Sequence, residues 1–223
     1  PRGQTVLILG EQGFGDDLHF IRYAKMVKNS GARVVFGCKP PLARLMKTVP
    51  GIDIVHPFNQ PPPEFHWFAP VMRLPAIFGT TIESIPSDVP YLSADPDDVQ
   101  IWAERLSDDH NMRVGLCWAG SARKHDPRVN RVDRRRSMRL ADFAPLASVP
   151  AVTYYSLQLG DGAGQKPPSG MHLVDLTEHI RDFADTAALI ENLDLVIAVD
   201  TSVCHLAGGL GKPVWMLSRF DCC

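Results

Sequence analysis

The stretch LILGEQGFGDDLHFIRYA, which runs from Leu7 to Ala24, sets the expected fold of the chain. A strand-like apolar run reaches a glycine-rich turn, and a pattern with helical spacing follows it. This order of strand, turn and helix is how a mononucleotide-binding unit begins. Yet Asp16 and Asp17 stand in the expected first turn of the helix, where two carboxylates would repel a phosphate.

Composition describes an ordinary globular protein. The 223 residues are 45% hydrophobic and 22% charged, with a formal net charge of -2. No overall field therefore attracts nucleic acid or an anionic membrane surface, and any anion site must be local. No run of about 18 apolar residues is present that would span a bilayer. The cysteines show no repeated CxxC spacing, which favours reduced thiols and a cytoplasmic protein over a disulfide framework or a zinc site. They are Cys38, Cys117, Cys204, Cys222 and Cys223.

Strand-like and helical patterns alternate along the chain in two sets, which predicts two α/β units with parallel sheets. The first set ends before the proline-rich passage from Asn59 to Pro63, which is typical of a surface loop. The second begins with the strand-like RVGLCWAG. We place the boundary near Asn111, giving domains 1–111 and 112–223. The last strand, PVWML, is followed almost at once by Cys223, so the second domain is expected to be cut short.

The second unit contains a predicted anion site within LDLVIAVDTSVCHLAGGLGKPVWML, residues 193–217. An apolar run ends at Asp200, and Thr201 and Ser202 open a helix whose N–H and hydroxyl groups could bind an anion. His205 returns to the same face about one turn later and could add a donor or a positive charge. The alternative is that Asp200 or Thr201 only caps the helix and His205 only packs.

The segment between Cys117 and Leu140 is the most basic part of the chain. It follows a predicted strand, so its Gly-Ser turn should face the same cleft as Thr201. A guanidinium fork there would bind a diphosphate bidentately, and Arg136, which enters the next helix, is the best placed. Most of the other basic residues are expected to be solvated: Arg123, Lys124, Arg128, Arg131, Arg134, Arg135 and Arg139.

The acidic glycine-rich turn suggests a different task from phosphate binding. A carboxylate at a strand end facing a cleft can act as a general base toward an acceptor hydroxyl, and Asp16 is the candidate. One of Asp16 and Asp17 is expected only to complement the helix dipole. Glu11 is a second candidate, and His19 could orient either carboxylate.

Four stretches together resemble the lipopolysaccharide heptosyltransferases, and more closely the glycosyltransferase-like domains that follow tetratricopeptide repeats in bacterial proteins. These stretches are GEQGFGDDLHFIRYA, RVGLCWAGS, RRRSMRLADFAPL and DLVIAVDTSVCHLAGGLGKPVWML. The resemblance covers both halves of the chain. It implies a GT-B fold, in which two Rossmann-like domains face each other across a cleft, and inverting sugar transfer without a metal or other cofactor.

The resemblance also implies roles for individual residues. Asp16 falls on the family's proposed base, and Arg136 falls on a basic residue that contacts the donor phosphates. Gln158 falls near the position that contacts the nucleoside. Asp200, Thr201 and His205 align with the family's donor-site Asp, Thr and His.

This chain departs from the family pattern at three points. Ser202 stands where heptosyltransferases commonly have Gly, Arg136 where they carry Lys, and Gln158 where they often carry Glu. The first domain is also shorter than theirs, so acceptor-binding insertions are expected to be absent.

The expected function is inverting, metal-independent transfer from a nucleotide-diphosphate sugar, ADP-linked, to a hydroxyl of a saccharide, lipid-linked or protein acceptor. A tetratricopeptide-repeat neighbour is an expected partner, and nucleic acid is not. Two alternatives stay open. One is a non-catalytic GT-B scaffold or sugar-nucleotide-binding module, and the other is a related enzyme such as a sugar-nucleotide epimerase.

Overall fold

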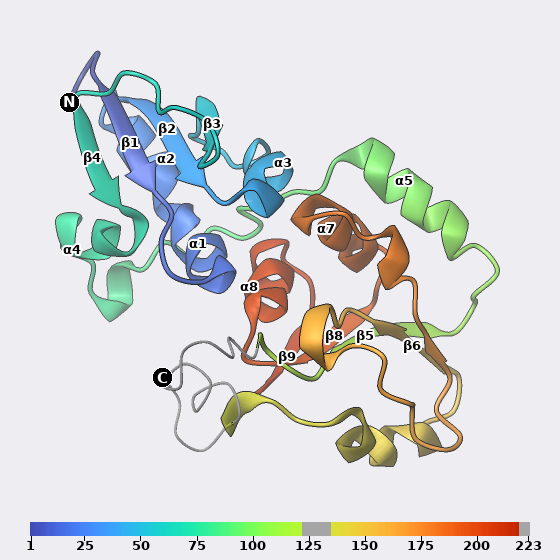
Figure 1. Cartoon of the computed structure of the whole chain (residues 1–223). Coiled ribbons are helices and arrows are strands. Elements are labelled where there is room, and N and C mark those ends of the chain that lie inside the picture. The colour runs from blue at the N-terminus through green and yellow to red at the C-terminus, as the bar shows by residue number, and fades with distance from the viewer. Residues whose placement is uncertain (122–134, 219–223) are drawn as a thin grey trace.

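The structure is a computed structural model that describes residues 1–121 and 135–218, and it contains two parallel sheets (Figure 1). The first sheet has the order β3-β2-β1-β4. Its strands are β1 (Thr5–Leu9), β2 (Arg33–Cys38), β3 (Ile54–Pro57) and β4 (Trp67–Pro70). The helices of this unit are α1 (Phe14–Phe20), α2 (Ala24–Asn29), α3 (Ala43–Met46) and α4 (Leu74–Ile77).

The second sheet has the order β7-β6-β5-β8-β9, again with every pairing parallel. Its strands are β5 (Met112–Cys117), β6 (Val152–Ser156), β7 (Leu173–Val174), β8 (Leu195–Val199) and β9 (Val214–Leu217). The helices associated with it are α5 (Pro96–Arg105), α7 (Phe183–Glu191) and α8 (Ser202–Gly209). The α/β class and the GT-B-like arrangement of two parallel sheets are therefore confirmed.

Each sheet reverses its winding direction at one point. In the first sheet, β2 and β3 extend to one side of β1 while β4 pairs on the other side. In the second, β6 and β7 lie on one side of β5, and β8 and β9 lie on the other. Ligands of open parallel sheets bind outside the carboxyl ends of strands at such reversals. The candidate site residues Asp16, Arg136 and Asp200 follow β1, β5 and β8, respectively.

A continuous apolar core runs from the first sheet into the second unit. Ile8 on β1 and Phe36 on β2 belong to the same buried cluster as Val196 on β8 and Leu206 on α8. Helix α1 packs against α8 where the two units meet, and the ribbons lie side by side there (Figure 1). A second buried cluster, including Leu116, covers the other face of the second sheet.

Local sequence signals explain where some elements begin or are interrupted. Asp95 caps α5 by accepting a hydrogen bond of 2.9 Å from the Asp97 amide, as the Asp-Pro pair predicts. The LADFAPL stretch lies in a 3-10 helix, Leu140–Ser148, that contains Pro145, which has no amide hydrogen for an α-helical bond. The helical pattern that follows the glycine-rich turn divides into α1, a 3-10 turn and α2.

Helix α5 complicates the predicted domain boundary. The two sheets divide between β4 and β5, as the boundary near Asn111 requires. However, α5 packs against α7 of the second unit, and Asn192 donates a hydrogen bond of 3.0 Å to the Val99 carbonyl. The division into residues 1–111 and 112–223 stays a prediction. None of the helices within residues 1–121 and 135–218 has the length and apolar character of a membrane span.

Candidate functional site

The candidate site lies where α1 of the first unit meets α8 of the second. Gly15 makes this approach possible, because a Cβ atom built on it would lie 2.9 Å from Cδ2 of His205 and 3.6 Å from Cα of Ser202. These two helices follow β1 and β8 at their carboxyl ends. The glycine-rich turn and the Asp-Thr-Ser segment are therefore brought together from opposite ends of the chain.

Asp16 lies half-buried in the first turn of α1. Its Oδ2 atom accepts a hydrogen bond of 2.8 Å from the backbone amide of Gly13. The carboxylate therefore satisfies one of the amides that a helix start leaves without an intrahelical partner. This bond fixes the side chain at the interdomain end of the loop. Its role as a general base stays a prediction.

Asp17 points the other way, into the first unit, and is fully buried. Its Oδ1 atom accepts a hydrogen bond of 2.9 Å from the Glu11 amide, and Lys39 Nζ lies 3.8 Å from Oδ2. Burial raises the pKa of Asp17 to about 6, although Lys39 opposes that rise. Glu11 in turn accepts a hydrogen bond of 3.2 Å from the Met72 amide. The carboxylates of Asp17 and Glu11 therefore hold the glycine-rich loop in place.

His19 reaches His205 across the domain junction, rather than a carboxylate of its own loop. The two Nδ1 atoms are 3.2 Å apart, and the rings meet edge to face with their centroids 5.0 Å apart. Burial is the main cause that lowers the pKa of His19 to about 4, and burial also lowers the pKa of His205. Burial therefore favours the neutral form of His205, in which the ring can offer one N–H donor, and it disfavours the positive charge that the sequence also allows.

Arg136 and Asp200 meet on the second unit, as the two motifs predict. Arg136 donates a hydrogen bond of 3.0 Å from Nη1 to the backbone carbonyl of Asp200. The Asp200 carboxylate lies 3.9 Å from Nε2 of His205. The segment after β5 is thus joined to the end of β8 beside the start of α8. The predictions for Arg123, Lys124, Arg128, Arg131 and Arg134 fall outside the described residues.

Thr201 occupies the N-cap position of α8, but no described side chain caps the first amides of this helix. The Thr201 hydroxyl lies 3.7 Å from Sγ of Cys117 instead. The alternative in which Thr201 caps the helix through its side chain is therefore wrong. Ser202 is the first residue of α8 and is partly exposed, and its Cα lies 3.6 Å from a Cβ atom built on Gly15.

Gln158 is almost fully buried after β6, and its amide group acts as a clamp. Oε1 accepts hydrogen bonds from the amides of Trp118, at 3.0 Å, and Ala119, at 2.7 Å. Nε2 donates to the carbonyls of Ala119 and Leu159. Because both amide hydrogens are used, contact with a nucleoside would require the release of one of these bonds. The predicted nucleoside contact stays a prediction.

Two arginines at the domain junction were not identified as functional or structural residues from the sequence. Arg22 bonds to the carbonyls of His19 and Pro86 and to the Tyr91 hydroxyl, and its guanidinium lies 4.5 Å from the centre of the Tyr91 ring. It joins α1 to the segment that connects the two units. No local spacing could reveal this arrangement, because Tyr91 is 69 residues away.

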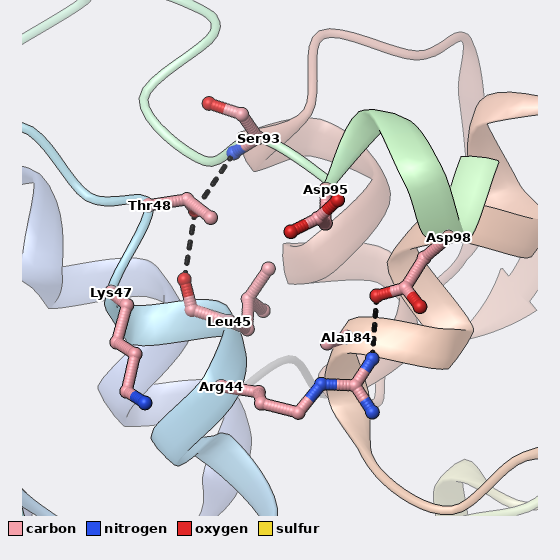
Figure 2. A pocket seen from close by; sticks show the side chains of 8 residues that line it. All are labelled: Arg44, Leu45, Lys47, Thr48, Ser93, Asp95, Asp98 and Ala184. Atoms are coloured by element: carbon pink, nitrogen blue, oxygen red, sulfur yellow. Dashed lines mark hydrogen bonds and ion pairs between the residues drawn. The ribbon is translucent and has the colours of Figure 1, made fainter. Parts of the chain in front are cut away.

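Arg44 joins the two units at a second place. Its Nη2 atom lies 2.6 Å from Asp98 on α5 and 3.1 Å from Asp185 on α7, and Nη1 lies 3.5 Å from Asp182. Figure 2 shows Arg44 and Asp98 beside a cavity of about 370 Å³. The predicted site residues do not line this cavity, which is bordered by Arg44, Leu45, Lys47, Thr48, Ser93, Asp95, Asp98 and Ala184.

Comparisons with known proteins agree with this architecture. No family model matches the chain. The FlbA protein of Caulobacter vibrioides is 25% identical over 97% of this chain, which spans only 40% of FlbA. The ADP-heptose lps heptosyltransferase II of E. coli superimposes with a TM-score of 0.65 at 11% identity, covering 95% of this chain and 84% of that one.

A glycosyl transferase family 9 protein from Veillonella parvula gives a TM-score of 0.63 at 11% identity, covering 96% of this chain and 80% of its own. Both superpositions extend over the two sheets and their helices, because they cover nearly the whole chain. The chain therefore shares its fold with these two glycosyltransferases.

Proposed function

We propose that the chain is an inverting, metal-independent glycosyltransferase domain that transfers a sugar from a nucleotide-diphosphate donor to a hydroxyl acceptor. The observation that carries this proposal is the contact between α1 and α8. It places Asp16 on one side of the domain junction and the group formed by Arg136, Asp200 and His205 on the other. The proposed base and the proposed anion-binding group thus lie on opposite sides of one junction.

The second unit would bind the donor diphosphate. Arg136 supplies a guanidinium beside the start of α8, where amides without a described side-chain cap and the helix dipole favour an anion. Thr201, Ser202 and the neutral His205 ring add hydroxyl and N–H donors. Together these groups would stabilise the charge that develops on the leaving diphosphate, the task that a divalent cation performs in other enzymes.

Asp16 would take the proton from the acceptor hydroxyl. The hydroxyl oxygen then attacks the anomeric carbon on the face opposite the diphosphate, and the carbon–oxygen bond to the diphosphate breaks. The electron pair leaves with the diphosphate, and the configuration at the anomeric carbon inverts. Asp17 is unsuited to this task because it is fully buried inside the first unit.

ADP is the nucleotide that we propose, because the E. coli protein with the same fold is described as an ADP-heptose enzyme. The proposed acceptor is a hydroxyl of a saccharide, a lipid-linked sugar or a protein. A cytoplasmic location and a neighbouring tetratricopeptide-repeat domain stay predictions.

The test is release of ADP from ADP-heptose with water as the acceptor, followed by proton NMR of the freed sugar before its anomers equilibrate. We expect the inverted anomer.

Asp16→Asn should slow release by about 100-fold or more, since a positioned general base contributes 10²–10⁴. Asp97→Asn is the matched control, because Asp97 is an exposed carboxylate in the first turn of α5. A retained anomer, or full release by Asp16→Asn, would contradict the mechanism. ADP binding without any turnover would favour the scaffold alternative.

A further inference from the structure

The contact between His19 and His205 constrains the protons on both rings. Their Nδ1 atoms lie 3.2 Å apart, which is hydrogen-bonding distance. A hydrogen bond between two imidazole nitrogens needs one proton, so one Nδ1 must donate and the other must accept. Two doubly protonated rings would place two N–H groups against each other. The pair therefore has only two neutral arrangements.

Asp200 distinguishes these arrangements. Its Oδ1 atom lies 3.9 Å from Nε2 of His205, so the field of the carboxylate favours a proton on that nitrogen. A neutral ring with its proton on Nε2 has a bare Nδ1, which accepts. His19 must then donate from Nδ1. In the opposite arrangement, the bare Nε2 of His205 would face a carboxylate.

Neighbouring charges act in both directions on a second proton at either ring. Arg22 disfavours the charged form of both histidines, and Arg136 disfavours that of His205. Asp16 acts on both rings in the opposite direction, as Asp200 does on His205. Burial outweighs these carboxylates and lowers both pKa values. Burial therefore favours the pair in which both rings are neutral.

We propose that His19 is a positioning residue of the first unit that holds His205 in its Nε2–H form, so that this N–H can donate to a diphosphate oxygen of the donor. The identity of the ligand rests on the proposed function, whereas the tautomer does not. A donor site on the second unit would then depend on a residue of the first. Diphosphate binding and the approach of α1 to α8 would be coupled through one hydrogen bond.

The tautomer can be read directly from ¹⁵N chemical shifts of the histidine rings in the nucleotide-free chain, with His205→Gln used for assignment. We expect His205 to show a protonated Nε2 and a bare Nδ1 at pH 7. His19→Leu, which cannot donate, leaves Asp200 at 3.9 Å as the remaining influence on the Nε2 proton and should convert His205 to a mixture of tautomers. His19→Asn should restore the wild-type pattern, because its amide nitrogen can take the place of Nδ1–H. A protonated Nδ1 on His205, or an unchanged pattern in His19→Leu, would overturn the proposal.

Calorimetric titration with ADP tests the consequence for binding. We expect His19→Leu to weaken ADP binding about twofold, because the apparent affinity falls in proportion to the fraction of His205 that keeps its proton on Nε2, and we expect His19→Asn to restore it. Equal ADP affinity in wild type and His19→Leu would overturn the coupling but leave the proposed function intact if Arg136→Ala still weakens binding. If the wild-type chain binds no ADP, the proposed function and the ligand assignment both fail. The ¹⁵N chemical shifts of the two histidine rings would still show whether His19 sets the tautomer of His205.

Discussion

Gly15 and His205 are packed so closely that a single methyl group on Gly15 would lie 2.9 Å from Cδ2 of the imidazole. This contact joins α1 to α8 and thereby the first sheet to the second. Real Cβ atoms do not pack so closely, so any larger residue at position 15 must displace the ring or separate the helices. The glycine is therefore required by the domain junction.

Gly15→Ala should destabilise the chain by about 1–3 kcal/mol, the usual cost of overpacking a well-packed site. The measurement is urea unfolding. Gly208→Ala is the matched control, since Gly208 lies in α8 and a Cβ built there meets nothing within 4 Å. The control should gain up to about 1 kcal/mol from helix propensity. Equal effects of the two substitutions would contradict the close packing.

Asp17→Asn should gain stability relative to wild type as pH rises from about 4 to about 6. The pKa of Asp17 is raised from 3.8 to about 6 in the folded chain, so the folded state binds more protons than the unfolded state in this range. The contribution of this carboxyl group is therefore lost as pH rises. Asn cannot titrate and keeps an oxygen for the Glu11 amide. Urea unfolding at several pH values measures the difference, and a difference independent of pH would refute the assignment.

Arg44→Met should destabilise the chain by about 1–3 kcal/mol, because Asp185 is buried and would lose one of its two arginine partners. Arg181 remains as the second partner, and Arg44 itself is about one-third exposed, which limits the loss. The pKa of Asp185, now about 2, should rise in the variant. NMR titration would follow this change.

Lys25→Met is the control for Arg44→Met. Its ion pair with Asp88 is exposed, and removing such a pair changes stability by less than about 1 kcal/mol. A loss for Arg44→Met no larger than that of the control would show that the Arg44 cluster does not stabilise the domain junction.

Gln158→Glu should lower stability at pH 7 by about 1–3 kcal/mol or more. The new carboxylate would keep the hydrogen bonds from the Trp118 and Ala119 amides, but its second oxygen would face the carbonyls of Ala119 and Leu159. Protonation would restore one donor, so the loss should shrink at acidic pH. Thermal unfolding at pH 5 and pH 7.5 measures both effects. Equal stability of the variant and wild type at both pH values would show that the hydrogen bonds of the Gln158 amide group do not stabilise the chain.

The fold was predictable because buried parallel strands are nearly continuous apolar runs. All five residues of β8 are buried, and the run from Leu195 to Val199 is apolar throughout. Strand β4 was missed, since it is short, begins with the exposed aromatic pair Trp67 and Phe68 and ends at Pro70. Its position beside β1 depends on pairing across 61 residues, which local periodicity does not encode.

The site was predictable to the extent that strand ends determine it. Asp16, Arg136 and Asp200 follow three different strands, and parallel topology brings the ends of those strands to the domain junction. The inward direction of Asp17 and Gln158 could not be predicted, because a polar residue after a strand usually faces solvent. The contact between His19 and His205 depends on packing between the two units, across 186 residues.

The central claim is that the second unit binds the donor diphosphate at the domain junction while Asp16 acts only in transfer. Calorimetric titration of ADP into wild type, Arg136→Ala and Asp16→Asn tests this claim most directly. We predict binding to wild type, affinity weakened by about 30-fold or more in Arg136→Ala, as expected for a roughly 2–5 kcal/mol charge-assisted contact, and affinity within about threefold of wild type in Asp16→Asn. Absence of binding to wild type, or equal affinity in wild type and Arg136→Ala, would contradict it.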